Sequence, residues 1–112
     1  MDSTELDDIL AALADPTRRR VVDLLSSGPR RASELADGAG LSRPAMSRHL
    51  RVLRMRGIVE EESPDEDARV RMYRLRPGPL RELRGWLDEV EAFWTDQLAA
   101  FKAHAEGRGR AS

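Results

Sequence analysis

Residues 41–59 read LSRPAMSRHLRVLRMRGIV, and this stretch decides the fold. Its larger inward-facing apolar residues are spaced three and four positions apart, as on one face of a helix: Met46, Leu50 and Leu53. Ser42 can cap the start of that helix, and Gly57 is well suited to end it. The stretch therefore predicts a helix with an apolar inner face and an outer face rich in arginine.

A short helix with a tight turn is predicted directly before this stretch. The short helix covers residues 34–37, with Ser33 as its cap, and Gly38-Ala39-Gly40 forms the turn that follows. A turn of this length sets the two flanking helices at a steep angle. The two elements together predict a helix-turn-helix.

Two more helices are predicted towards the N-terminus. The first carries an apolar stripe of Leu6, Ile9, Leu10 and Leu13. It ends at Asp15-Pro16, because the residue before a proline avoids the helical conformation. The second begins at Pro16, takes Asp15 as its cap, and ends at Gly28-Pro29.

A β-hairpin and a long helix are predicted after this stretch. One strand begins at Ile58-Val59, residues 63–67 form a turn, and residues 69–75 form the second strand. From residue 80 to about residue 105 the apolar residues recur at helical spacing over about 39 Å, more than so small a domain can cover. An uncovered stripe of this kind usually meets a partner helix.

The predicted fold is therefore mainly α with a small β-hairpin, a winged helix-turn-helix with a long C-terminal dimerisation helix. We assign residues 1–106 to a single domain that includes N- and C-terminal dimerisation helices. We expect residues 107–112 to form a disordered tail.

The net charge of −1 conceals an uneven distribution of charge. Residues 16–57 carry ten arginines and three acidic residues, whereas residues 1–15 carry five acidic residues and no basic one. Residues 58–112 carry nine basic and twelve acidic residues. A basic middle between acidic flanks indicates a positive face that binds a polyanion, although solvated helix faces would give the same counts.

Several classes of function are disfavoured by composition. Cysteine is absent, which excludes disulfides, thiolate zinc sites and thiol nucleophiles. No apolar run approaches the ~18 residues that a membrane span needs, so we expect a cytoplasmic protein that binds no membrane. The histidines lie 55 positions apart, and no glycine-rich phosphate loop or serine elbow is present. We therefore expect no enzymatic activity and no cofactor.

The outer face of the helix that follows Ser42 has the composition of a DNA-reading surface. It presents Ser42, Arg43, Ala45, Ser47, Arg48 and Arg51. Arginine reads guanine edges or pairs with phosphate, serine hydroxyls and helix N-termini bind phosphate, and alanine packs on thymine methyl groups. We therefore expect double-stranded DNA as the partner.

Two motifs in this order resemble the ArsR-type bacterial repressors. The first is ADPTRRRVVDLL in residues 14–25, and the second is the stretch 41–59, with the string SRHL at residues 47–50. The resemblance extends over residues 9–87. It implies a winged-helix homodimer, paired through its first and last helices, that binds a palindromic operator and represses transcription.

The same resemblance implies further site residues. By position it adds His49 to the recognition helix and places Arg69 and Arg71 on the wing, behind an acidic tip at residues 65–67. For the dimer interface it implies apolar residues of the first and last helices: Leu6, Ile9, Leu13, Leu87, Val90, Trp94, Leu98 and Phe101.

The sequence departs from the metal-sensing members of that family. Their cysteine-bearing motif corresponds here to residues 32–37, ASELAD, which contain no thiol. Other members carry the pattern Asp-x-His-x10-His-x2-Glu on the last helix, and here Val90 and Phe101 occupy the two histidine positions. We therefore expect no metal site, and the effector, a small molecule or a protein, is not identified by the sequence.

Alternatives stay open at several positions. His49 is a packed helix residue, a phosphate contact or a titrating switch, and the run Arg18–Arg20 forms either one phosphate contact or surface ion pairs. The aromatic residues of the last helix form the core or dimer interface, or line a ligand pocket: Trp86, Phe93 and Trp94. A winged helix can also be a protein-interaction module whose long helix binds a different protein, but such a module needs no arginine-rich recognition helix.

Overall fold

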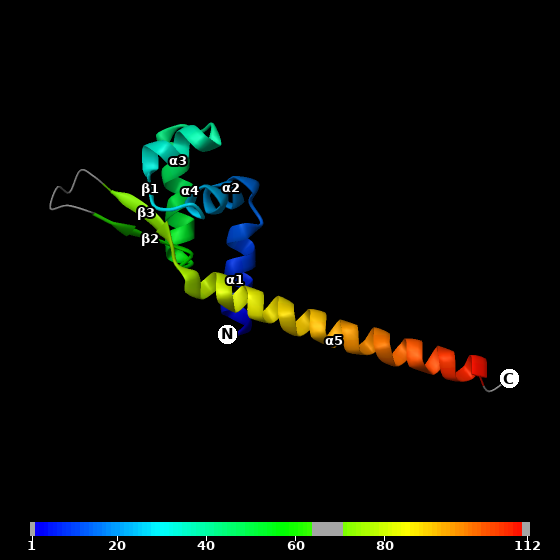
Figure 1. Ribbon diagram of the computed structural model, residues 1–112. Helices are drawn as coiled ribbons and strands as arrows, with labels where there is room; N and C mark the ends of the chain where they lie inside the picture. The colour runs from blue at the N-terminus through cyan, green and yellow to red at the C-terminus, as the bar shows by residue number, and fades with distance from the viewer. Residues whose placement is uncertain (1, 64–70, 111–112) are drawn as a thin grey trace.

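The computed structural model describes residues 2–63 and 71–110 (Figure 1). In chain order the elements are α1 (Ser3–Leu13), α2 (Pro16–Leu25), β1 (Arg30–Arg31), α3 (Ala32–Ala39), α4 (Arg43–Met55), β2 (Val59–Glu62), β3 (Met72–Leu75) and α5 (Pro77–Arg110). The shorter helices and a small sheet form a head, from which α5 projects as a long rod (Figure 1). This arrangement confirms the predicted fold class.

The hydrophobic core lies where α2, α3, α4 and the sheet meet. α4 contributes the three residues predicted to face inward: Met46, Leu50 and Leu53. They cluster with buried residues of the neighbouring elements: Val21, Leu25, Leu35, Ala36, Ile58 and Val59. Burial of one large aliphatic side chain is worth about 1.5–3 kcal/mol. The cluster therefore holds α4 in one rotational setting, with its basic side directed outward.

Local capping sets where two of the helices begin. Oδ1 of Asp15 accepts hydrogen bonds from the backbone N–H groups of Thr17 (2.8 Å) and Arg18 (3.1 Å) at the start of α2. Oγ of Ser42 accepts a hydrogen bond from the backbone N–H of Ala45 (3.3 Å) at the start of α4. Both caps agree with the prediction from sequence.

The start of α3 differs from the prediction. Ser33 was expected to cap a helix over residues 34–37, but α3 begins one residue before it, and Ser33 lies in the first turn. The cause is β1, because Arg31 ends that strand and leads directly into α3. Oε1 of Glu34 reaches back and accepts a hydrogen bond from the backbone N–H of Arg31 (3.3 Å).

The sheet within the described residues is antiparallel, with the strand order β1-β3-β2. Tyr73 in the central strand pairs with Arg30 of β1 on one side and with Glu61 of β2 on the other. The hairpin of β2 and β3 was predicted, but β1 was not, because a strand of two residues has no readable alternation. This short strand connects the wing to the start of α3.

α5 extends far beyond the head. Its 34 residues give a rod of about 51 Å, and the longest dimension of the protein is 77 Å. Its N-terminal part packs against α1, and the remainder projects away (Figure 1). α5 is longer than the predicted range of 80–105 at both ends, and residues 107–110, which were assigned to the tail, belong to it.

Candidate nucleic-acid interface

α4 directs its basic side into solvent. Arg43, Ser47, Arg48 and Arg51 are exposed, whereas Ala45 is half-buried. The turn between α3 and α4 is tight because Gly40 adopts a left-handed conformation with φ of +68°, which a glycine accommodates without strain. The side of α4 that does not pack on the core is therefore free to enter a groove of DNA.

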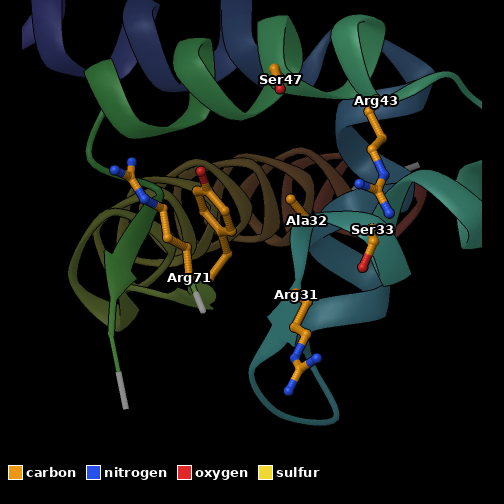
Figure 2. A pocket seen from close by; sticks show the side chains of 7 residues that line it. Arg31, Ala32, Ser33, Arg43, Ser47 and Arg71 are labelled. Carbon is orange, nitrogen blue, oxygen red and sulfur yellow. The ribbon is translucent and has the colours of Figure 1, made fainter. Parts of the chain in front are cut away.

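An open groove runs beside the N-terminal half of α4 (Figure 2). It has a volume of about 420 Å³ and is lined by Arg31, Ala32, Ser33, Arg43, Ser47, Arg71 and Tyr73. Arg43 extends from α4 towards Ser33 at the start of α3 (Figure 2). We call this feature, formed by the seven residues named, the arginine groove.

The lining of the arginine groove suits a phosphate group. Its charged side chains are all guanidinium groups, its hydroxyls come from two serines and a tyrosine, and none of its lining residues is acidic. Guanidinium groups present paired N–H donors that match the geometry of phosphate oxygens. The first turn of α3 also borders the groove, and helix N-termini favour anions.

Glu61 on β2 holds two arginines of this region in place. Its carboxylate lies 2.9 Å from Nη1 of Arg71 and 2.7 Å from Nη1 of Arg54, and its side chain is only 13 % exposed. Burial, and then the negative charge of Glu61, raise the pKa of the neighbouring Tyr73 phenol. Tyr73 is therefore a neutral hydrogen-bond donor in the arginine groove at physiological pH.

The opposite face of the wing carries a ladder of ion pairs. Arg74 pairs with Glu60 and, at 3.5 Å, with Glu62, while Arg76 lies 3.7 Å from Glu60. These arginines are neutralised by carboxylates of the neighbouring strand, so they attract DNA less than Arg31 and Arg43 of the arginine groove, for which the described residues provide no ion pair. Arg69, predicted as a wing contact, and the acidic tip lie outside the described residues.

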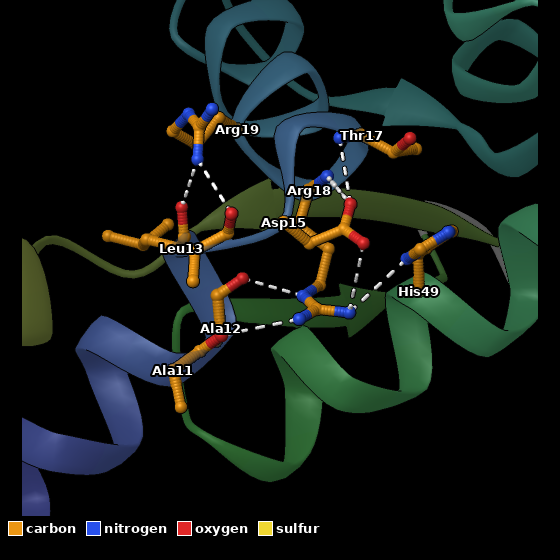
Figure 3. Close-up of polar contacts among 9 residues, drawn as sticks. Ala11, Ala12, Leu13, Asp15, Thr17, Arg18, Arg19 and His49 are labelled. Atoms are coloured by element: carbon orange, nitrogen blue, oxygen red, sulfur yellow. Dashed lines mark hydrogen bonds and ion pairs between the residues drawn. The ribbon is translucent and has the colours of Figure 1, made fainter.

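His49 lies on the flank of α4 that faces α2, half-buried beside Arg18 (Figure 3). Nδ1 of its ring is 3.4 Å from Nη1 of Arg18. The same guanidinium donates hydrogen bonds to the carbonyl oxygens of Ala12 (2.6 Å) and Ala11 (3.3 Å) at the end of α1. Of the roles left open for His49, this position favours a packing role, and a DNA contact stays a prediction.

Arg19, the next residue, also donates hydrogen bonds to carbonyl oxygens at the end of α1. Nη1 of Arg19 donates hydrogen bonds to the carbonyl oxygens of Leu13 (2.8 Å), the last residue of α1, and Ala14 (2.9 Å), which follows it (Figure 3). Arg20 is exposed. Within the run Arg18–Arg20, two guanidinium groups thus cap the C-terminal end of α1, where cations are favoured.

The predicted dimer residues fall into two groups. In α1, Ile9 is buried within the protomer, and Leu6 and Leu13 are half-buried. In α5, large apolar side chains remain exposed, and we call this set the α5 stripe: Leu87, Val90, Trp94, Leu98 and Phe101. Trp94 and Phe101 are 61 % and 73 % exposed. Apolar side chains in such a row mark a surface that another molecule covers.

The described part of the chain contains neither a cluster of metal ligands nor a membrane-spanning helix. Within residues 2–63 and 71–110, no three histidine or acidic residues lie close enough together to hold a metal ion. None of the helices in those ranges combines the length and the apolar character that crossing a bilayer requires. His49 and His104 belong to different helices, α4 and α5.

Several residues of this interface were not selected from sequence. Arg31, Ser33 and Tyr73 join the arginine groove because β1 pairs with β3, and that pairing was not predicted. The one available signal was the pair Arg30-Arg31 next to a predicted helix start. The contact of Arg18 with His49 spans 31 positions and has no local signal.

The segment that contains α2, α3 and α4 is similar to known regulatory proteins. Residues 15–61, which include α2, α3 and α4, match the family described as "Bacterial regulatory protein, arsR family". A relative, an HTH-type transcriptional regulator of Mycobacterium tuberculosis, is 39% identical over 98 residues, which cover 88% of this chain and 86% of the relative. The transcriptional repressor SdpR of Bacillus subtilis is 27% identical over 82 residues, which cover 73% of this chain and 88% of the repressor.

Solved structures show the same architecture. An ArsR-like transcriptional regulator from a Rhodococcus species superposes with a TM-score of 0.73 at 33% identity, covering 88% of this chain and 91% of that one. A possible ArsR-family regulator of Mycobacterium bovis, described as a homodimeric winged helix-turn-helix DNA-binding domain, has a TM-score of 0.61 at 22% identity. That match covers 85% of this chain and 82% of the other.

Proposed function

The chain belongs to the ArsR family of bacterial regulatory proteins and is a winged-helix transcriptional regulator, and from this premise we propose that two copies bind a palindromic operator and repress transcription. The observation that carries the proposal is the arginine groove beside the exposed face of α4. Because the family comprises regulators and not enzymes, the prediction that the chain has no catalytic role is confirmed.

In the proposed complex, α4 lies in the major groove and the arginine groove receives the adjacent phosphate backbone. The exposed side of α4 offers Arg48 and Arg51 to base edges, with Arg43 and Ser47 nearer the backbone. Base contacts give sequence specificity, whereas phosphate contacts fix the register of the protein on the duplex. The arginine groove would thus position the helix that reads the sequence.

We propose a homodimer because the α5 stripe is uncovered in a single chain. The row extends from Leu87 to Phe101, along the part of α5 that projects from the head. Pairing with a second α5 and its α1 would bury this row, and the Mycobacterium bovis neighbour is described as homodimeric. The dimer would present two recognition helices to half-sites about 34–36 Å apart, one turn of the duplex.

Regulation would come from any event that changes this spacing. An effector, a small molecule or a protein, would act by binding at the paired helices. Because the DNA of a bacterium is in its cytoplasm, we expect the chain to act there. The alternative of a pure protein-interaction module is not favoured, because the chain belongs to a family of DNA-binding regulators.

Selection of DNA fragments by the purified protein, followed by sequencing, tests the proposal. We expect a palindrome with half-sites one turn apart. Titration of the selected operator should then show that Arg31→Ala lowers affinity for operator and random DNA equally and reduces the salt slope by about one. Arg84→Ala is the matched control, because this exposed arginine lies on α5 outside the arginine groove. Recovery of no palindrome would refute the proposal.

A further inference from the structure

We propose that Arg18 is a positioning residue for DNA recognition, which fastens α4 to the end of α1 and so sets the angle at which α4 meets DNA. The inference rests on the proposed function, because in the proposed dimer two copies pair through α1 and α5. Arg18 is not offered as a DNA contact, since its side chain is only 17% exposed and is directed into the protein.

The inference depends on the contacts of one planar group, the guanidinium of Arg18 (Figure 3). Arg18 belongs to α2, yet its Nε and Nη2 atoms donate to the carbonyl oxygens of Ala12 and Ala11 in α1, at 2.6 and 3.3 Å. Its Nη1 atom lies 3.4 Å from Nδ1 of His49 in α4 and 3.9 Å from Oδ2 of Asp15. A guanidinium group is rigid and holds its donors in fixed directions. Three helices are therefore joined through one side chain.

The chemistry of this contact fixes the state of the His49 ring. Arg18 has donors and no acceptor, so Nδ1 of His49 must accept the hydrogen bond. The proton of the neutral ring is then on Nε2, which points away from Arg18 (Figure 3). The contact thus requires that Nδ1 is the accepting nitrogen of the ring.

A second link between the same helices shows why the Arg18 contact matters for orientation. Asp8 in α1 and Arg56 at the end of α4 form an ion pair at 3.2 Å, in which both side chains are 40 % exposed. An exposed ion pair constrains geometry weakly. Arg18 links the middle of α4, at His49, to α1 through more buried, directional hydrogen bonds. With both links in place, a tilt of α4 relative to α1 would break at least one of them.

Arg19 supplies a matched control. It is the next residue, it also donates to carbonyl oxygens at the end of α1, and no described contact joins it to α4. Arg19→Gln therefore removes a similar helix cap and the same charge, and leaves the link between α1 and α4 intact. Any effect that Arg18→Gln has and Arg19→Gln lacks is due to the link.

The first test uses the free protein. Nitrogen-15 NMR of the imidazole rings reports which ring nitrogen carries the proton, and the chain has two histidines, His49 and His104. We expect the Nε2–H form for His49 in the native protein and a changed Nδ1 signal in Arg18→Gln. The Arg19→Gln variant and the exposed His104 should show no change. A His49 signal that is the same in Arg18→Gln and the native protein overturns the inference.

The second test measures the angle of α4 through DNA spacing. The native dimer should bind its operator about tenfold more tightly than a version with two extra base pairs between half-sites, because a recognition helix held at one angle cannot follow the displaced half-site. In Arg18→Gln this ratio should fall to about twofold, while Arg19→Gln keeps the native ratio. Equal ratios in the two variants overturn the inference.

A third variant covers the case in which Arg18→Gln does not fold. His49→Gln removes Nδ1 and leaves Arg18 on the α1 carbonyl groups, so it should lower the spacing ratio in the same way. If Arg18→Gln folds, the double variant that combines it with His49→Gln should have a spacing ratio no lower than that of Arg18→Gln alone, because both substitutions act through one contact. If the NMR change occurs but the native chain selects no DNA, the proposed function fails while the Arg18–His49 contact stands.

Discussion

Oε1 of Glu61 lies 2.9 Å from Nη1 of Arg71, so one arginine of the arginine groove is already paired with a carboxylate of the protein. The same carboxylate holds Arg54 at 2.7 Å. When phosphate approaches Arg71, it competes with Glu61 for the same N–H donors. Glu61 therefore lowers the attraction of this surface for any polyanion and leaves sequence-specific contacts with a larger share of the affinity.

Replacing this carboxylate should strengthen binding to random DNA. In Glu61→Gln the charges of Arg54 and Arg71 are no longer balanced, so we expect affinity for random DNA to rise several-fold and the salt slope to grow by about one. Fluorescence anisotropy over a salt series measures both quantities. Glu62→Gln is the control, because Glu62 pairs with Arg74 on the opposite face of the wing. An unchanged slope in Glu61→Gln would mean that Arg71 does not meet phosphate.

Arg48 tests direct reading of bases. This exposed residue of α4 is not among those that line the arginine groove. If it contacts a base edge, Arg48→Ala should weaken operator binding by about 1–3 kcal/mol and relax specificity at one base pair in each half-site. Titration against operators substituted at single positions measures this effect. Equal weakening on operator and random DNA would assign Arg48 to the phosphate backbone instead.

Val90 tests the pairing surface. Val90→Glu would place an unpaired carboxylate in the α5 stripe, which pairing buries, at a cost on the order of several kcal/mol. Sedimentation should show a dimer for the native chain and a monomer or an unfolded chain for the variant. Glu89→Gln, which changes an exposed neighbour outside the α5 stripe, should remain dimeric. A native chain that is monomeric at tens of micromolar would contradict the dimer.

Metal ions are expected to have no effect on DNA binding. A sensing site would need ligands that act on the DNA-binding helices, and His49 and His104 belong to different helices. Zinc, cadmium or arsenite at low micromolar concentration should therefore leave operator affinity unchanged at fixed ionic strength. A tenfold loss that a chelator reverses and His104→Ala abolishes would show that a metal site exists.

Asp15 gives the protein a pH dependence at its N-terminal end. Burial disfavours the ionised carboxylate, but the N–H groups of Arg18 and Thr17 and the charge of Arg18 outweigh it, so the pKa of Asp15 is lowered. A lowered pKa in the folded state stabilises the protein above the unfolded value of about 3.9, and this contribution is lost as the pH falls through the folded value. At neutral pH the carboxylate is therefore a stabilising cap.

Urea unfolding of Asp15→Ala measures this contribution. The variant should lose about 1–2 kcal/mol of unfolding free energy at pH 7, because the cap of α2 is removed. The difference from the native chain should shrink as the pH falls below about 4. Asp15→Asn, which retains a capping oxygen, should lose less at pH 7. A difference that does not vary with pH would mean that the charge of Asp15 has no part in stability.

Features that depend on neighbouring residues could be predicted from the sequence. The inner face of α4 and the caps at Asp15 and Ser42 follow from helical spacing and from local hydrogen bonds, and each is found in the structure. The start of α3 was predicted wrongly at Ser33 because a distant strand decides it. β1 has two residues and exists only because β3 lies beside it.

The composition of the arginine groove could be predicted only in part. Arg43, Ser47 and Arg71 were selected because α4 and the wing can be recognised separately. Arg31 and Tyr73 join them across the pairing of β1 with β3, which leaves no trace in either segment alone. Glu61 entered the prediction only as one of the twelve acidic residues of the segment 58–112, and its position between two arginines depends on the register of β2.

The placement of the aromatic residues gives the two surfaces separate optical reporters. Both tryptophans of the chain, Trp86 and Trp94, lie on the exposed apolar side of α5, and its one tyrosine, Tyr73, lines the arginine groove. Indole emission shifts to shorter wavelength when water is removed from the ring, so it reads pairing of the chains. Emission of the Tyr73 phenol reports whether the arginine groove is occupied. Assembly and DNA binding can thus be followed in the unlabelled protein.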